Sequence, residues 1–144
     1  MLLLFDQDLN DRTFKLRSKV EGEWCIGYDD MHSERMWLNL QSCNSPLAGL
    51  WNMNEYGTIH AAGNSSLCVF SETNTCVSGD TGLFVTSCDE QDEASRSRWR
   101  VDSTGSIYCG GSHCAIDILE VEVGGSIVMR PKTDSSTRQQ WYLN

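Results

Sequence analysis

The stretch Leu38-Asn39-Leu40-Gln41-Ser42-Cys43, followed by Trp51, recurs in altered form twice further along the chain. The second copy is Leu83-Phe84-Val85-Thr86-Ser87-Cys88, followed by Trp99, and the third is Ile127-Val128-Met129-Arg130-Pro131-Lys132, followed by Trp141. The tryptophans are 48 and 42 residues apart. In every copy the first and third positions are apolar, a period of two that is typical of a half-buried strand. A repeat of this length governs the choice of fold.

Other positions repeat in register with these strands. A cysteine precedes the first two copies, at Cys25 and Cys68, whereas Ala115 stands at that place in the third. Gly57 and Gly105 each lie six residues after a repeat tryptophan, which predicts a turn with positive φ. The third copy ends just after its tryptophan, so we expect residues 13–16 of the N-terminus to supply its missing strand.

Each unit therefore reads as about four short strands, and no long apolar run has helical spacing. Three such units closed in a ring predict an all-β fold, a β-trefoil, with one tryptophan per unit in a shared core. We expect a single domain over residues 1–144, with units of about 14–60, 61–108 and 109–144. The alternative is a β-sandwich in which the tryptophan spacing is accidental.

Composition narrows the class of protein. The chain has 144 residues and a formal net charge of −9, which suits one domain with one core. Negative charge argues against binding to nucleic acid or to anionic membranes. No transmembrane segment is expected, and the apolar run at residues 1–5 is too short for a signal peptide.

Seven cysteines are many for this length. Matched positions in two units predict the disulfides Cys25–Cys43 and Cys68–Cys88, and the third unit lacks both members of the pair. Cys109 and Cys114 could bridge a short hairpin loop, which would leave Cys76 over. Disulfides predict an oxidising compartment, hence a secreted protein or an ectodomain. A metal site is the rival reading, but no Cys-x-x-Cys pair is present; we expect neither metal nor cofactor.

These residues resemble the ricin B-chain type lectins, the R-type lectin family, whose repeat carries Cys-x-Asp, an apolar strand ending in Cys, Gln-x-Trp and Gly-x-Ile. The resemblance covers nearly the whole chain from about Phe14, and residues 139–141 form a full Gln-x-Trp. Loss of the cysteine pair from the third unit also resembles the cysteine-rich domain of mannose-receptor-type proteins. The resemblance implies binding of sugars, usually galactose-type, at up to one shallow pocket per unit.

The resemblance also implies roles for particular positions: an Asp that accepts hydrogen bonds from sugar hydroxyls, an aromatic that stacks on the ring, an Asn that binds the sugar and a Gln that supports the Asp. The first unit has Gly27, Gln41 and Ala48 at the Asp, aromatic and Asn positions. The second has Phe70, Thr86 and Arg96. The third has Asp117, Arg130 and Arg138, together with Gln139. The third unit is thus the candidate site, without the aromatic platform.

The two arginines beside Asp117 suggest an anionic glycan, sialylated or sulfated, because guanidinium groups pair with carboxylate and sulfate. The alternative is that Arg130 and Arg138 pair with acidic neighbours such as Asp117 or Asp134 and bind nothing.

Catalysis finds no support, because His32, His60 and His113 have no nucleophile motif beside them. Trp24 and Trp37 lie outside the repeat; each could be an exposed binding aromatic, but we expect Trp37 to pack. The predicted function is glycan or glycoprotein recognition, without enzyme activity. The alternatives are a trefoil that has lost sugar binding and serves as a protein-interaction module, or the targeting domain of a larger protein.

Overall fold

The computed structural model describes residues 12–28, 35–73, 76, 80–89, 98–109, 113–133 and 135–144. Within these residues one short 3-10 helix, η1 (Thr137–Gln139), is present, and the other regular elements are strands. The prediction of an all-β fold is therefore confirmed. No helix in this part of the chain has the length and apolar character needed to cross a bilayer.

The twelve strands fall into three sets of four along the chain. The first set is β1 (Leu16–Ser18), β2 (Trp24–Tyr28), β3 (Met36–Ser42) and β4 (Trp51–Met53). The second is β5 (Ile59–Ala61), β6 (Asn64–Ser71), β7 (Thr81–Ser87) and β8 (Trp99–Val101). The third is β9 (Ile107–Cys109), β10 (Cys114–Ile118), β11 (Ile127–Pro131) and β12 (Trp141–Leu143).

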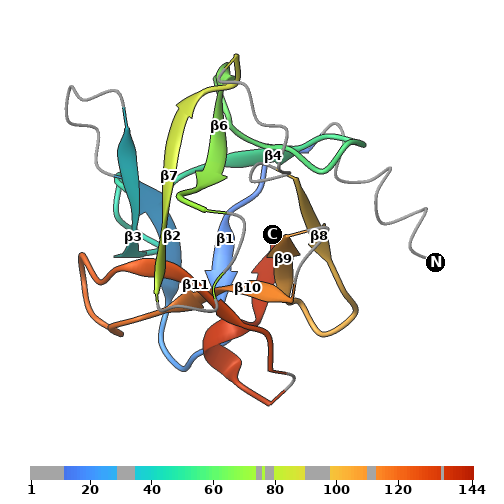
Figure 1. The fold of residues 1–144 in the computed structure, drawn as a ribbon. Helices are drawn as coiled ribbons and strands as arrows, with labels where there is room; N and C mark the ends of the chain where they lie inside the picture. Colours follow the sequence, from blue (N-terminus) through green and yellow to red (C-terminus); the bar gives the residue numbers. More distant parts are fainter. Residues whose placement is uncertain are drawn as a thin grey trace.

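Each set contributes one antiparallel hairpin, β2–β3, β6–β7 or β10–β11, and Figure 1 shows the three around a common centre. The hairpins are joined to one another, since β7 pairs with β3 on one side and with β11 on the other. A bridge between Asn39 and Ser126 joins the third side. This arrangement is that of a β-trefoil, the predicted fold.

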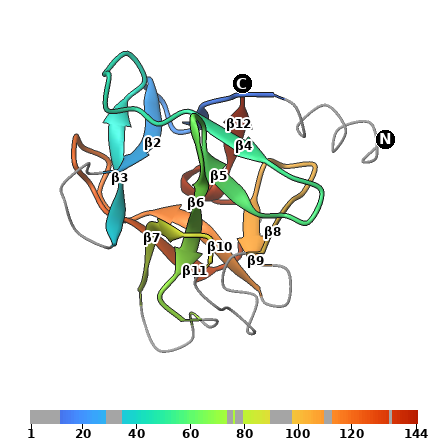
Figure 2. The same cartoon turned by 90° about the horizontal axis from the view of Figure 1, so that it is seen from above.

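The two ends of the described chain meet in one strand pair. β1 pairs with β12 along its whole length, with Leu16 opposite Leu143 and Ser18 opposite Trp141. Figure 2 shows the C-terminus beside the first described residues. The strand near the N-terminus therefore supplies the partner that the last strand needs.

The three repeat tryptophans lie in the core, as predicted. Trp51, Trp99 and Trp141 are 0, 2 and 1 % exposed. Each indole N–H donates to a backbone carbonyl of its own unit's second strand, at Ile26, Val69 and Ile116, over 3.2 to 3.3 Å. The repeat therefore fixes a polar contact as well as apolar packing, because a buried indole N–H needs an acceptor.

The two predicted turn glycines bind the next unit. Gly57 and Gly105 have φ of 87° and 90°, a conformation that favours glycine. Their carbonyls accept from the backbone N–H of Trp99 and Trp141, at 2.8 and 2.9 Å. A Cβ at Gly105 would lie 2.4 Å from the Trp141 carbonyl oxygen, so this close approach also excludes a side chain.

The turn before each of these glycines is closed by a side chain. The Asp102 carboxylate accepts from the backbone N–H of Thr104 at 2.9 Å and of Ser106 at 3.1 Å, and Lys132 Nζ lies 3.1 Å from its other oxygen. Asn54 accepts the corresponding pair of bonds in the first unit, at 3.0 Å each. Burial raises the pKa of Asp102, but hydrogen bonds from Thr104, Lys132 and Ser106 outweigh it and lower the pKa overall.

We expect the Asp102 carboxylate to make the free energy of unfolding depend on pH. Its pKa is lower in the folded than in the unfolded chain, so its contribution is present above the unfolded value of about 3.9 and is lost as pH falls through the folded value. Asp102→Asn should fold, because Asn54 closes the equivalent turn, and should lose less stability on acidification. Urea unfolding at neutral pH and at about pH 3 checks this; equal pH dependence in both proteins would contradict it.

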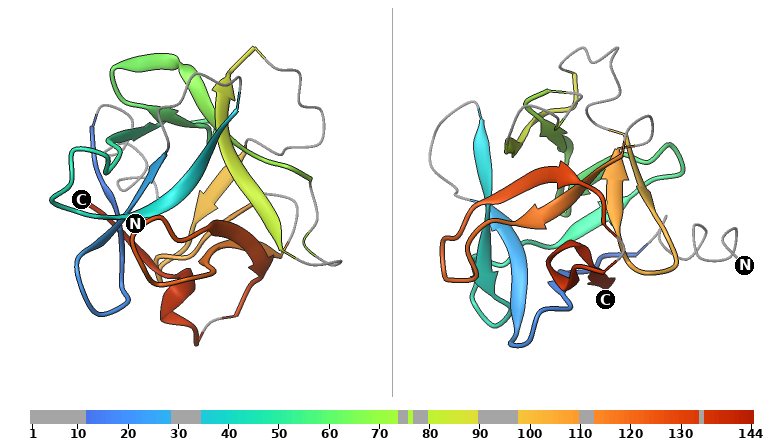
Figure 3. Two further views of the ribbon diagram at one scale, coloured as in Figure 1. Left: turned by 90° about the vertical axis from the view of Figure 1, so that its left-hand side faces the viewer. Right: turned by 60° about the horizontal axis from the view of Figure 1, so that its bottom comes forward.

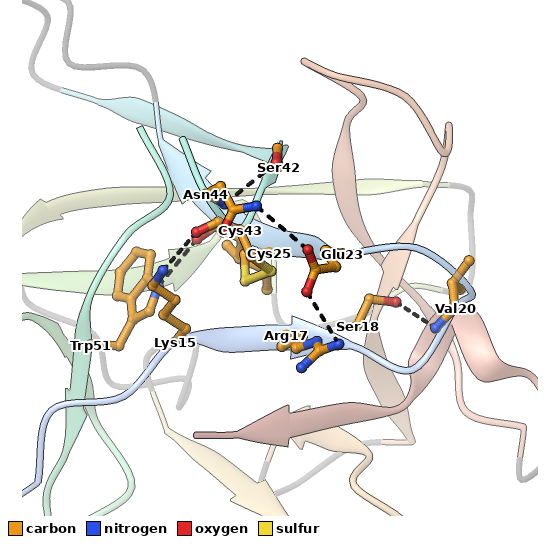
Figure 4. Close-up of a disulfide and its surroundings, with 11 residues drawn as sticks. Lys15, Arg17, Ser18, Val20, Glu23, Cys25, Ser42, Cys43, Asn44 and Trp51 are labelled. Atoms are coloured by element: carbon orange, nitrogen blue, oxygen red, sulfur yellow. Dashed lines mark hydrogen bonds and ion pairs between the residues drawn. A yellow bond between two sulfur atoms is a disulfide. The ribbon is translucent and has the colours of Figure 1, made fainter. Parts of the chain in front are cut away.

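Three disulfides hold the strands. Cys25–Cys43 and Cys68–Cys88 are present as predicted, with Cα atoms 4.9 and 5.0 Å apart. Figure 4 shows the first, where the Lys15 ammonium donates to the Cys43 carbonyl at 2.6 Å. The Lys15 bond ties β1 to the end of the first hairpin.

The expected bridge between Cys109 and Cys114 is wrong. Cys114 is bonded to Cys76, with Cα atoms 5.8 Å apart, and Cys109 is a buried thiol whose sulfur lies 3.5 Å from that of Met129. Short sequence separation suggested the hairpin bridge. The fold instead brings the segment before β7 to the start of β10, within the Cα spacing that a disulfide requires.

Candidate functional site

A buried carboxylate marks the third unit. Asp117 lies on β10, opposite Val128 of β11, and is 5 % exposed. Its Oδ2 accepts from Gln139 Nε2 at 2.9 Å. A buried charge is costly unless it is hydrogen-bonded, so this contact is a condition for keeping Asp117 in the fold.

Gln139 is held as firmly as the carboxylate that it contacts. Its amide Nε2 also donates to the Pro131 carbonyl at 2.9 Å, and its Oε1 accepts from the Thr133 N–H at 2.8 Å. Gln139 ends η1, which lies against β10 (Figure 3) and leaves the side chain 2 % exposed. These bonds fix which end of the amide faces Asp117, and they leave the other carboxylate oxygen facing away from Gln139.

That second oxygen, Asp117 Oδ1, is the unusual atom of the site. It is buried, and no group in the described part of the chain donates a hydrogen bond to it. Buried acceptors are rarely left in this condition, because the lost hydration costs about 1–3 kcal/mol. The atom is therefore suited to accept a hydrogen bond from a ligand hydroxyl.

Arg130 stands beside Asp117 but is bound to Asp80, the residue that precedes β7. Its guanidinium Nε and Nη2 donate to the two Asp80 carboxylate oxygens at 2.7 and 3.3 Å. The pairing of β11 with β7 sets Thr81 opposite Met129, so Asp80 and Arg130 come next in register. The hydrogen bond from Arg130 lowers the pKa of Asp80. The expected partners were Asp117 or Asp134; Asp80 is the partner observed, and Asp134 lies outside the described residues.

Arg138 is more weakly held. It is exposed, and its Nη1 donates to the carbonyls of Ile118 and Leu119 at 3.4 and 3.2 Å, the two residues that follow Asp117. Arg130 interacts electrostatically with Asp117, whereas Arg138 binds the backbone next to it. Asp80 was missed because it is far away in sequence and belongs to the second unit.

The equivalent place in the first unit is filled by the unit's own backbone. Gly27 forms a bridge with Ala48, and a Cβ at Gly27 would lie 2.2 Å from the Leu47 carbonyl oxygen. No aspartate side chain can be accommodated there without moving the backbone of Leu47. The sequence-based conclusion that this unit lacks the family's carboxylate thus has a steric counterpart.

The equivalent place in the second unit is filled by aromatic rings. Phe70 is 2 % exposed and stacks on Phe84 of the paired strand, with ring centroids 6.0 Å apart and an interplanar angle of 13°. Thr86 is buried beside Cys68 in the same pairing, and Arg96 lies outside the described residues. Two units of the trefoil are therefore closed to a ligand of the kind expected for Asp117.

Two further expectations concern single side chains. Trp24 packs partly buried against the core, whereas Trp37, which we expected to pack, is 45 % exposed. His60, Cys68 and Cys88 place three potential metal ligands within 4.8 Å in the part of the chain described, but the two sulfurs form a disulfide. Among the catalytic candidates weighed above, His32 lies outside the described residues.

Comparisons with known proteins agree with this fold. The chain matches the ricin-type beta-trefoil lectin domain over residues 12–141. No curated protein sequence matches it. The agglutinin from Abrus precatorius is similar in structure, with a TM-score of 0.70 and 18 % identity over 94 % of this chain and 48 % of that one.

Two other similar structures contain sugars. One is a non-toxic homologue of type II RIPs from Momordica charantia (bitter gourd) with α-methyl-D-galactoside, at TM-score 0.69 and 24 % identity over 92 % of this chain and 47 % of that one. The other is the C-half of the earthworm R-type lectin with GalNAc, at TM-score 0.72 and 14 % identity over 92 % and 98 %. This chain spans about half the length of the Abrus and Momordica chains. At sequence identities this low, the structural likeness shows a shared fold alone.

Proposed function

We propose that this chain, which belongs to the ricin-type β-trefoil lectin family, binds glycans through one site of that kind, in the third unit. The observation that carries the proposal is the Asp117–Gln139 pair. Gln139 secures one carboxylate oxygen at 2.9 Å, and the other oxygen is a buried acceptor without a donor in the described chain. A sugar hydroxyl supplies such a donor.

Entry of a sugar requires a side chain to move, because Asp117 is 5 % exposed. Arg138 is the side chain to move, since it is exposed and held to the chain by two hydrogen bonds longer than 3.1 Å. Arg130 stays, held by both oxygens of Asp80. In this proposal the displaced Arg138 guanidinium faces the bound glycan.

The proposed ligand is a galactose-type sugar, with a preference for a sulfated or sialylated form. The first part rests on the family and on the two related lectins that contain α-methyl-D-galactoside and GalNAc. The second rests on Arg138, because a guanidinium makes paired hydrogen bonds to sulfate or carboxylate. Three disulfides fit an extracellular glycan-binding protein or ectodomain.

A glycan array run with wild type, Asp117→Asn and Arg138→Ala side by side tests the proposal. Asp117→Asn keeps the shape and an acceptor for Gln139, but it removes the charge and is expected to reduce binding at least tenfold. Arg138→Ala is expected to keep neutral galactose-type ligands and to lose the preference for anionic ones. Asp89→Asn, at an exposed carboxylate after β7, is the matched control and should bind as wild type does.

The closed first and second units favour one other function, a trefoil that recognises a protein partner. The backbone of Leu47 occupies the first place and Phe70 with Phe84 the second, so two of three family sites are lost. Array binding that is equal in wild type and Asp117→Asn would refute the third-unit site. Absence of binding to every glycan by a folded wild type would refute glycan recognition and leave the protein partner as the function to pursue.

A further inference from the structure

One large aromatic side chain is exposed on the surface where β3 pairs with β7. Trp37 of β3 is 45 % exposed, whereas the three repeat tryptophans are at most 2 % exposed. Among the described residues of β3 and β7, Trp37 is the sole large hydrophobic side chain in the exposed class. The site at Asp117 makes no use of it, because Trp37 belongs to the first set of strands and lies where β3 pairs with β7.

The indole is held against β7. Trp37 is opposite Phe84, and their rings meet edge to face at 5.5 Å with an interplanar angle of 71°. The six-membered ring of the indole lies over Gly82, where a Cβ would come within 2.8 Å of indole Cζ3. Glycine at position 82 therefore lets the ring rest close to the strand. An aromatic seated in this way binds a flat partner without first losing much conformational freedom.

Polar groups stand at the edge of the same ring. The Glu72 carboxylate accepts from the Gly82 N–H at 3.0 Å, and its Oε1 would be 2.9 Å from a Cβ on Gly82, as close as the indole. The Arg35 guanidinium lies 4.3 Å from the centre of the Phe84 ring, which the indole also contacts. A carboxylate can accept about four hydrogen bonds, of which the Gly82 N–H supplies one.

We propose that Trp37, Glu72 and Arg35 form a second carbohydrate-binding surface, which takes the apolar face of one pyranose ring of a neutral glycan. The C–H groups of the ring pack on the indole, Glu72 accepts from a ring hydroxyl, and Arg35 donates to a ring or hydroxyl oxygen. This surface goes beyond the proposed function, since it uses none of the third-unit residues. It also gives the filled second-unit place a role, because Phe84, which stacks on Phe70, contacts the indole edge to face.

The size of the surface favours a sugar over a protein. An indole that is 45 % exposed offers on the order of 100 Å² of apolar area. That area matches one face of a pyranose, whereas a stable protein interface buries about 800 Å² per partner. Charge leads to the same choice, since a carboxylate and a guanidinium together match neutral hydroxyls better than a ligand of one charge.

The test follows the indole N–H signals of the whole 144-residue chain by ¹H–¹⁵N NMR. The five tryptophans give five such signals, and Trp37→Phe identifies that of Trp37. The titrants are galactose, N-acetylgalactosamine, glucose, N-acetylglucosamine and mannose. We expect the Trp37 signal to shift and saturate with at least one of them. No shift of this signal with any of the five sugars would overturn the proposal.

Variants separate this surface from the third-unit site. Trp37→Leu keeps an apolar contact with Phe84 but removes the flat ring, and should weaken binding by about tenfold or more; Trp37→Phe, which keeps a smaller ring, should weaken it less. Tyr56→Leu is the control, since Tyr56 is 68 % exposed elsewhere and should have no effect. Unchanged affinity in both folded Trp37 variants would overturn the proposal.

Both surfaces are then compared in one experiment. In Asp117→Asn the Trp37 signal should still shift, and in Trp37→Leu the array signal that depends on Asp117 should remain. Loss of all sugar binding in Asp117→Asn, with a Trp37 signal that never moves, would refute the second surface and keep the first. Array binding that is the same in Asp117→Asn and wild type, with a Trp37 signal that shifts, would refute the third-unit site and keep the surface at Trp37.

Discussion

Trp51→Ala is expected to lower the free energy of unfolding by about 3–5 kcal/mol, the usual cost of removing a large aromatic from a core. Trp51 is 0 % exposed, and Tyr28 packs on it with ring centroids 5.6 Å apart. Its indole N–H donates to the Ile26 carbonyl, which also accepts from the Gly49 N–H at 3.1 Å. The carbonyl stays paired in the variant, so nearly all of the loss comes from the cavity.

Urea unfolding under oxidising conditions measures this loss. Trp37→Ala is the matched control: it removes the same side chain at a place that is 45 % exposed, and should cost less than about 1.5 kcal/mol. Trp51→Phe fills part of the cavity and should fall between the two. Equal losses at positions 37 and 51 would contradict the assignment of Trp51 to the core.

Such a loss affects the whole trefoil, because each repeat tryptophan also joins neighbouring strands through its backbone. The Trp51 N–H and carbonyl exchange hydrogen bonds with those of Phe14, at 2.8 and 2.9 Å. Trp99 and Trp141 make the corresponding contact with Gly57 and Gly105. The side chain fills the core, and the backbone of the same residue, which Trp51→Ala retains, joins neighbouring units, so the cavity would lie next to the contacts that close the ring.

The fold could be predicted from the sequence because the repeated residues are of types that each occur in few structural settings. Tryptophans in register mark the core, Gly57 and Gly105 mark turns with positive φ, and the Cys25–Cys43 pair marks the two strands of one hairpin. Each of these features recurs at the same position in at least two units. An accidental match in one unit would not be repeated in another.

Features that occur once were harder to predict. The ion pair between Asp80 and Arg130 joins the second unit to the third, and the position of Arg130 holds Gln41 and Thr86 in the other units, which cannot form such a pair. The indole of Trp37 rests over Gly82, two residues before its cross-strand partner Phe84, a position that depends on the pairing of β3 with β7. The roles of Asp117, Arg130, Arg138 and Gln139 in sugar binding remain predictions, to be decided by the array.

The disulfide between Cys76 and Cys114 is the second feature with a large expected effect. It closes a loop with a sequence separation of 38 residues and ties the segment before β7 to β10. The chain-entropy relation gives about 4 kcal/mol for a loop of this size. Cys76→Ser with Cys114→Ser is therefore expected to lower the free energy of unfolding by about 3–4 kcal/mol. Both cysteines must be replaced, because Cys114 left alone could bond with Cys109, which follows Tyr108, the cross-strand partner of Ala115.

Cys109→Ser is the control, since it leaves all three disulfides in place and should cost far less than the double variant. Non-reducing digestion of wild type supplies the independent check: the peptide with Cys76 should be joined to the peptide with Cys114. A bond between Cys109 and Cys114, with Cys76 as a thiol, would restore the hairpin bridge that the sequence suggested. In that case the stability of Cys76→Ser alone should match wild type, because that variant would remove a thiol and keep the Cys109–Cys114 bond.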